Sequence, residues 1–460
     1  MNRMVGSFRG NSHLEDGDFQ AAHEFVVAQK GSIFRNEQTF SLAHPVIWIF
    51  AGTSVFLAAW LFPPRLFTEL FRVESRMFLD MQTFLYSAAC VLCTLFGVWV
   101  GGGGRFNSRL PQIVATTDLN RAPNTRIALL LLMITANFVA VALFARSGGI
   151  SAILDSLRGN GTLNRGMREI SEGSGGSLWV AALSGSAVFA PLAFQIYRSM
   201  PDARWTRILV VVFFLTYVIA ALMTSRRNLL ARPLFGILLL YLIWPSERRL
   251  TRTKAISICV AAATIMVVLF LSLGFIRRGF NESREIISEP LRYLITPYNT
   301  QALIQHDELI LPGTSSGYYW TEWIWKFPML DNIFDLETLR SEFLGEKGLT
   351  GAIERGLILK SQGVTTVTSF PAFACSWLDF GWMGSLPFAI AGLFAGWSWR
   401  GLLQGNSCQI LLYPVIAYSF MEWRANLMFP GLSTDYALML IAVVQVGFFF
   451  ERRERAQGQF

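Results

Sequence analysis

Charged residues are scarce in this chain. Aspartate, glutamate, lysine and arginine make up 15% of its 460 residues, against roughly 25% in an ordinary soluble domain. Hydrophobic residues make up 53%. A soluble fold cannot hide so many apolar side chains, whereas a lipid bilayer solvates them. The composition therefore excludes a soluble globular protein and predicts an all-α polytopic membrane protein.

Metal- and nucleotide-binding motifs are also lacking. The five cysteines mostly fall inside apolar segments or at their edges, and Cys90 and Cys93 have no histidine or acidic neighbour. We therefore interpret them as packing residues. No P-loop and no GxGxxG opening a helix is found, and the predicted outer face has no Asp-x-Asp pair. We expect no cofactor, no metal and no nucleic-acid partner.

Apolar segments are what the chain has instead. A membrane span needs about 20 mostly apolar residues to cross roughly 30 Å of hydrocarbon, and about ten such segments recur. Several are short, which predicts tight packing in a bundle. The predicted spans are Pro45–Leu61, Thr83–Gly101, Ile127–Ala145, Leu178–Tyr197, Ile208–Thr224, Leu229–Trp244, Ile256–Ile276, Trp382–Trp399, Ile410–Trp423 and Tyr436–Phe450.

The spans divide the chain into five parts, and its basic residues orient them. The first 40 residues are polar and mixed in charge, unlike a cleavable signal peptide. Short arginine-rich loops follow the second, fourth and sixth spans, which places both termini in the cytoplasm. The parts are a cytoplasmic segment at 1–44, seven spans in 45–276, a large outer loop at 277–381, three spans in 382–450 and a cytoplasmic tail at 451–460.

Arginine also occurs on the predicted outer side, against this preference. One interpretation is a set of headgroup contacts made by snorkelling side chains. The other is an anion site, because only five of the 39 basic residues are lysine and the arginine fork grips phosphate oxygens in bidentate fashion. The candidate pyrophosphate-binding residues are Arg226, Arg227, Arg232, Arg277, Arg278 and Arg292.

The outer loop carries two patterned segments. Ser283–His306 predicts one or two amphipathic helices, broken at Pro290 and Pro297, that lie at the membrane interface. Tyr318–Lys326 is rich in aromatic residues, which is typical of a membrane-interface belt or of a sugar-stacking platform. The candidate substrate-binding residues are Tyr298, Trp320 and Trp323.

A proton acceptor can be sought in the same loop. His306 is the one histidine on the predicted outer face, and Asp307 and Glu308 flank it. It is the first candidate for a general base, with Asp379 and Glu322 behind it. Asp379 lies at the membrane edge, where it could cap the eighth span, pair with an arginine or act chemically, and capping is favoured.

The arrangement resembles a known family. A many-span protein with the outer loop Ser225-Arg226-Arg227, a long outer loop between late spans and the re-entry Leu378-Asp-Phe-Gly-Trp-Met-Gly384 is similar to the bacterial Wzy-type polymerases of oligosaccharide repeat units. The likeness covers about residues 45–450. It implies a GT-C-like glycosyltransferase in the bacterial inner membrane, with its large loop in the periplasm.

The resemblance also implies substrates and partners. The donor would be a growing glycan on undecaprenyl pyrophosphate and the acceptor one repeat unit on the same lipid, without nucleotide sugar or metal. A flippase and a chain-length regulator would act beside the polymerase. Two alternatives stay open. One is an O-antigen ligase that transfers glycan to lipid A-core, and the other is a transporter of lipid-linked sugar, although neither internal repeats nor charges in mid-span favour it.

Overall fold

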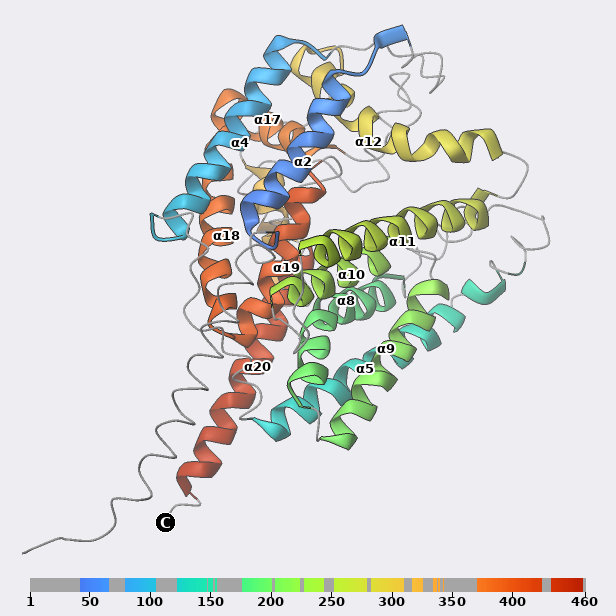
Figure 1. Cartoon of the computed structure of the whole chain (residues 1–460), viewed down its shortest axis with the longest axis vertical. Coiled ribbons are helices and arrows are strands. Elements are labelled where there is room, and N and C mark those ends of the chain that lie inside the picture. Colours follow the sequence, from blue (N-terminus) through green and yellow to red (C-terminus); the bar gives the residue numbers. More distant parts are fainter. Residues whose placement is uncertain are drawn as a thin grey trace, which may run out of the picture.

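The computed structural model describes residues 42–65, 79–104, 122–146, 148–151, 154, 176–200, 203–223, 227–243, 252–278, 283–309, 317–325, 334–336, 338–339, 342, 370–423 and 432–457. The regular elements within these ranges are helices (Figure 1). The principal ones are α2 (Pro45–Trp60), α4 (Met81–Gly101), α5 (Pro123–Arg146), α8 (Gly176–Ser199), α9 (Arg204–Met223), α10 (Arg227–Ile243), α11 (Arg252–Arg278), α12 (Ser283–Gln305), α13 (Tyr318–Trp325), α17 (Ala372–Phe380), η3 (Gly381–Ser385), α18 (Pro387–Leu403), α19 (Ser407–Met421) and α20 (Leu432–Gln457).

Each predicted span overlaps one of these helices, but only some helices are long and apolar enough to cross a membrane alone. Within the residues that the structure describes, four meet that condition, or five if α17, η3 and α18 form a single span bent by 87°. Four shorter apolar helices lie in α2, α10, α11 and α19. The fold is consistent with a helical membrane protein, and the number of ten crossings stays a prediction.

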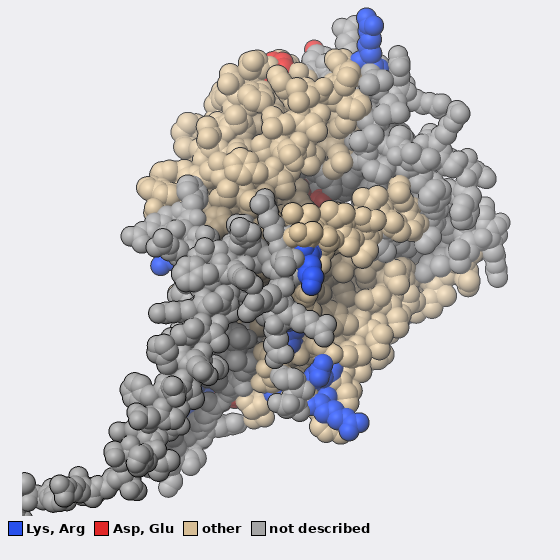
Figure 2. All heavy atoms as spheres, viewed as in Figure 1, with Lys and Arg blue, Asp and Glu red and all other residues tan. Residues whose placement is uncertain are grey.

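The outside of the bundle is apolar. Leu92 and Phe96 on α4, Leu215 on α9 and Phe449 on α20 are each about 60% exposed. Figure 2 shows that charged side chains are few among the described residues on one face of the molecule. So much exposed hydrophobic surface would drive a soluble protein to aggregate, whereas it suits a protein surrounded by lipid.

The centre of the bundle is α19. Nearly every residue of this helix is buried, on all of its sides, because it contacts α2, α8, α10, α18 and α20. A helix that is apolar all round belongs in the interior of a bundle. Its short length therefore reflects burial among other helices, in line with the tight packing predicted from the sequence.

Among the described helices, α4 and α18 make the most extensive contact, running side by side along the left of Figure 1. Glycines form the contact on both helices. A Cβ atom at Gly392 of α18 would collide with the carbonyl oxygen of Thr94, and one at Gly97 of α4 with that of Ala389. The close approach predicted for Gly392 and Gly396 is thus confirmed, and Gly97 and Gly101 supply the matching small residues.

A methyl group at this interface should separate the two helices. We expect Gly392→Ala to lower the free energy of unfolding by about 1–3 kcal/mol, as other overpacking changes do. Gly185 of α8 is the matched control, because a Cβ atom there meets no atom within 4 Å. Gly185→Ala should leave the midpoint temperature of thermal unfolding unchanged or raise it, since alanine favours the helical conformation more than glycine does. Thermal unfolding in detergent measures both, and equal midpoints would contradict the packing argument.

The predicted interfacial helices 283–306 are corrected by the structure. One helix, α12, continues through both prolines, because each proline removes only a single helical hydrogen bond. Its residues 295–305 are buried against α2, α4 and α17. Figure 1 places α12 at the end of the bundle opposite the C-terminus. The second half of α12 is therefore part of the bundle core.

Candidate functional site

His306 lies directly after α12, in a turn that fixes its position. The backbone N–H of Asp307 donates to the carbonyl of Ile304, at 3.2 Å, and that of Glu308 to the carbonyl of Leu303, at 2.9 Å. These two bonds form a Schellman motif. The motif needs a left-handed residue, and Asp307 has φ 56°. His306 is thus the C-cap of a buried helix, and its side chain emerges at the surface.

The partner of His306 comes from α4. Its Nε2 lies 3.1 Å from Oδ2 of Asp80, and the two side chains are 33% and 40% exposed. The other oxygen of Asp80 accepts a hydrogen bond from the backbone N–H of Thr83, at 2.9 Å, as the N-cap of α4. The indole of Trp60 donates to the Asp80 carbonyl, at 3.3 Å. One carboxylate therefore begins α4 and holds the histidine.

Electrostatics favour this pair. A helix C-terminus attracts a cation and a helix N-terminus an anion, and here the C-terminus of α12 meets the N-terminus of α4. Partial burial would raise the pKa of Asp80, but hydrogen bonds from Thr83 and the charge of His306 outweigh it and lower the pKa. Ionised Asp80 therefore stabilises the folded state at pH values above the ordinary pKa of aspartate. This stabilisation is lost as pH falls through the lowered pKa of Asp80.

The turn itself can be tested. Asp307→Gly keeps the left-handed conformation and should leave His306 in place. Asp307→Val should disturb it, because a β-branched residue disfavours positive φ, at a cost of about 1–2 kcal/mol. At matched protein abundance, we expect Asp307→Val, and not Asp307→Gly, to slow any reaction in which the His306 side chain takes part. Equal rates for the two variants would show that the turn does not position the histidine.

Below the His306–Asp80 pair, α4 and α12 meet along a polar seam. Gln301 Nε2 of α12 donates to Ser87 Oγ of α4, at 3.0 Å. Gln305 lies one turn after Gln301, toward His306, and Thr83 lies one turn before Ser87, toward Asp80. All four side chains of the seam are buried. The seam is thus a row of uncharged polar groups leading inward from an exposed histidine.

Asp379 caps a helix, although not the one predicted. Its carboxylate accepts hydrogen bonds from the backbone N–H groups of Tyr319, at 3.2 Å, and Trp320, at 3.0 Å. It therefore caps α13, and α18 does not begin until Pro387. Asp379 is buried, and the Trp320 indole donates to Ser376 of α17, at 2.8 Å. These bonds give Asp379 a structural task.

The re-entry motif forms the elbow between α17 and α18. Gly381 ends α17 with φ +57°, and a Cβ atom at Gly384 would collide with the carbonyl of Ser376. The chain then turns by 87° into α18. This bend moves the start of the helix from the predicted Trp382 to Pro387. Glycine is required at both positions, first for backbone conformation and then for space.

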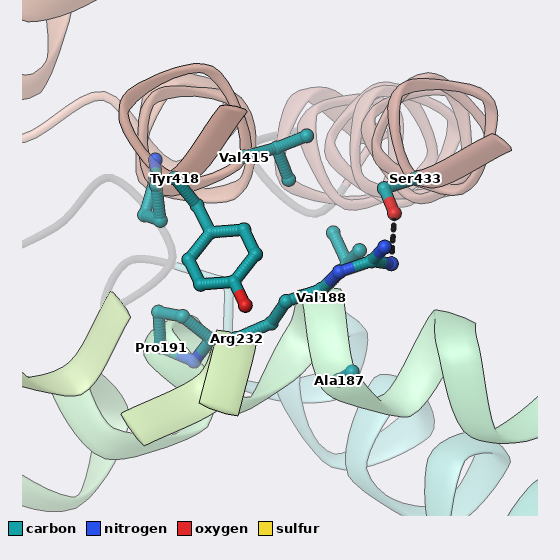
Figure 3. A pocket seen from close by; sticks show the side chains of 8 residues that line it. Ala187, Val188, Pro191, Arg232, Val415, Tyr418 and Ser433 are labelled. Carbon is teal, nitrogen blue, oxygen red and sulfur yellow. Dashed lines mark hydrogen bonds between the residues drawn. The ribbon is translucent and has the colours of Figure 1, made fainter. Parts of the chain in front are cut away.

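A second site surrounds Arg232 of α10 (Figure 3). Its Nη1 donates to the Ser433 hydroxyl of α20, and its guanidinium lies 6.0 Å from the centre of the Tyr418 ring of α19. The cavity has a volume of about 20 Å³, which is room for about one water molecule. The remaining lining residues, Ala187, Val188, Pro191, Pro414 and Val415, carry no charge. A cation thus faces a small cavity with mainly apolar walls.

Prolines shape this cavity. Pro191, Pro233 and Pro414 lie inside α8, α10 and α19, and each removes the helical bond to the carbonyl four residues earlier. For Pro233 that carbonyl belongs to Leu229, which accepts from the Tyr217 hydroxyl instead. A Cβ atom at Gly236 would collide with Pro191. The three helices therefore cross closely beside the arginine.

Helix α13 contacts both α17, which carries Asp379, and α20, which carries Ser433. Tyr298 is buried between Phe56 and Phe373, so its ring belongs to an aromatic cluster of the bundle. Trp320 is partly buried on Phe388. Arg226 lies outside the described residues. For six further candidates the structure describes the helix but not the side chain. They are Arg227, Arg277, Arg278, Arg292, Glu322 and Trp323.

Sequence reasoning missed Asp80, Ser433 and the glutamines of the seam. An aspartate directly before an apolar span is the signal of an N-cap, but nothing in the sequence pairs it with His306. Glutamines at 301 and 305, one turn apart in a helix with a buried face, were a signal for a polar contact between helices.

Among the described residues, no three histidine, cysteine, aspartate or glutamate side chains gather closely enough to hold a metal ion. The comparisons with known proteins add no assignment. The chain matches no model of a protein family, no curated protein and no solved structure.

Proposed function

We propose that this protein is a glycosyltransferase of the bacterial inner membrane that polymerises oligosaccharide repeat units carried on undecaprenyl pyrophosphate. In this proposal the bundle is GT-C-like and crosses the membrane about ten times, with both termini in the cytoplasm. The end formed by α12 and the start of α4 faces the periplasm. The position of α12 opposite the C-terminus supports this orientation.

The observation that carries the proposal is the His306–Asp80 pair, 3.1 Å apart at a partly exposed end of the bundle. In the proposed step the acceptor hydroxyl oxygen attacks the anomeric carbon of the donor glycan. His306 takes the hydroxyl proton, and Asp80 orients the imidazole and stabilises the imidazolium that forms. The bond between the anomeric carbon and the pyrophosphate oxygen breaks, and the pyrophosphate leaves with the electron pair.

The Arg232 cavity supports the same reaction. The leaving pyrophosphate carries two or three negative charges, so a fixed cation beside it stabilises the transition state. Arg232 is held by Ser433 and Tyr418 from two other helices, which pre-organises its guanidinium. The apolar exterior of the bundle would accommodate the isoprene units of the lipid.

The test is extension of lipid-linked repeat units by the purified full chain in detergent, with EDTA and without nucleotide sugar. We expect a ladder of glycans on undecaprenyl pyrophosphate. His306→Ala protein, prepared in parallel, is the control for a contaminating enzyme. Growth that depends on an added nucleotide sugar would overturn the proposal. Transfer to lipid A-core without a ladder would identify a ligase, and movement of substrate between leaflets without bond formation would identify a transporter.

A further inference from the structure

The polar seam between α4 and α12 contains buried hydrogen-bonding atoms that the described structure leaves unsatisfied. Both Nε2 and Oε1 of Gln305 lack a partner, and so does Oε1 of Gln301. Gln305 is 6% exposed and Gln301 is fully buried. A buried polar atom without a hydrogen bond costs about 1–3 kcal/mol, so native proteins seldom keep several together unless a ligand or water completes them.

The position of these atoms points toward the reaction site. Gln305 immediately precedes His306, and two contacts between α4 and α12 bracket it: Gln301–Ser87, at 3.0 Å, and His306–Asp80, at 3.1 Å. The unsatisfied amide therefore lies between a buried contact and an exposed one. The unsatisfied amide thus belongs to the residue directly before the proposed base, at the end of the same helix.

The chemistry of the seam distinguishes its ligand from that of the Arg232 cavity. A glutamine amide offers one donor group and one acceptor group and has no net charge. Such atoms match sugar hydroxyls, each of which donates and accepts. A pyrophosphate presents acceptors alone and favours the cation of Arg232. Neutral polar atoms beside the proposed base thus fit the sugar that must lose a proton.

We infer that Gln305, together with Gln301 one helical turn before it, forms a subsite for the acceptor. The subsite binds the acceptor sugar that carries the attacking hydroxyl. The inference rests on the proposed function. In it, the amide of Gln305 bonds a hydroxyl on the acceptor sugar and sets the angle at which the neighbouring hydroxyl meets His306. Gln305 is then a binding and specificity residue for the acceptor, and Arg232 holds the pyrophosphate of the donor.

Binding measured apart from catalysis tests this assignment. The full chain in nanodiscs is titrated with two probes: the repeat-unit oligosaccharide freed from its lipid, and undecaprenyl pyrophosphate without sugar. Gln305→Met keeps length and helix propensity and removes the hydrogen bonds. We expect it to weaken oligosaccharide binding about tenfold, as for one lost buried bond, and to leave undecaprenyl pyrophosphate binding unchanged.

The matched control is Gln409→Met, because Gln409 of α19 is also buried with an unsatisfied Oε1 but belongs to neither site. It should bind both probes as wild type does. If Gln305→Met fails to fold, a second measurement on the wild-type protein replaces it. Added oligosaccharide should slow hydrogen exchange at residues 301–309, and undecaprenyl pyrophosphate alone should not.

Wild-type oligosaccharide affinity in folded Gln305→Met, or no change in exchange at 301–309, would overturn the subsite. Failure of the proposed function looks different. In that case wild-type protein builds no ladder in the polymerisation assay. If the wild-type protein builds ladders and Gln305→Met keeps the wild-type affinity for the oligosaccharide, only the subsite assignment is wrong and the proposed function stands.

Discussion

Replacing His306 with alanine is expected to slow glycan transfer by about 10²–10⁴-fold, the range for loss of a general base. The imidazole is one-third exposed and lies at a helix terminus, so its removal should change the free energy of unfolding little. Lipid-linked substrate should still bind, because the base takes part in proton transfer. Rate and ladder length at matched membrane abundance, with the thermal midpoint, measure the effect.

Asp80→Asn is the variant that isolates the role of the carboxylate. Asparagine is as good an N-cap as aspartate, so α4 should begin normally while the charge beside His306 disappears. We expect a smaller loss of rate than for His306→Ala. The double variant should be no slower than His306→Ala alone, because Asp80 acts through the histidine. Additive losses would mean that the carboxylate acts independently, and a wild-type rate for His306→Ala would move the base to Asp379 or Glu322.

The helices could be predicted because the signal for them is local. Apolar runs such as those of α4 and α5 are continuous in the sequence and need no knowledge of the fold. The glycines of α18 were similarly informative, since small residues spaced by a turn indicate close packing. Their partner was not predictable from α18 itself, because the choice among the other helices depends on the whole bundle.

Contacts between segments that are distant in the chain could not be predicted from the sequence. His306 was chosen for its own chemistry and for Asp307 and Glu308, yet the carboxylate that faces it is Asp80. Asp307 instead supplies the left-handed turn. Asp379 was expected to cap the helix that follows it and caps α13, which precedes it in the chain. In each case residue type was informative, whereas the partner depended on how the helices fold together.

The position of α12 shows why periodicity alone misled. Ser283–His306 has the composition of an interfacial helix, because polar and apolar residues alternate along it. In the structure its second half is buried, and Thr296, Asn299, Thr300, Gln301 and Gln305 lie inside the bundle. Polar side chains on a buried helix are tolerated where another helix supplies partners, as Ser87 does for Gln301.

Replacing Arg232 with alanine is expected to cost about 2–4 kcal/mol of transition-state stabilisation, by analogy with the loss of one preorganised donor, and so to slow transfer by about 10²–10³-fold. Lysine keeps the charge and loses the bidentate fork, so Arg232→Lys should retain part of the rate. The measurement is single-turnover transfer at matched protein abundance, with competition by undecaprenyl pyrophosphate.

The control must separate charge from packing, since the arginine stem also fills the cavity beside Tyr418. Arg232→Met keeps most of the stem and removes the cation. If the guanidinium binds pyrophosphate, methionine should be as slow as alanine, and undecaprenyl pyrophosphate should compete less well against either variant than against wild type. If Arg232→Met instead keeps the wild-type rate and the wild-type competition, only the packing of the arginine stem in the cavity matters, and the anion site is wrong.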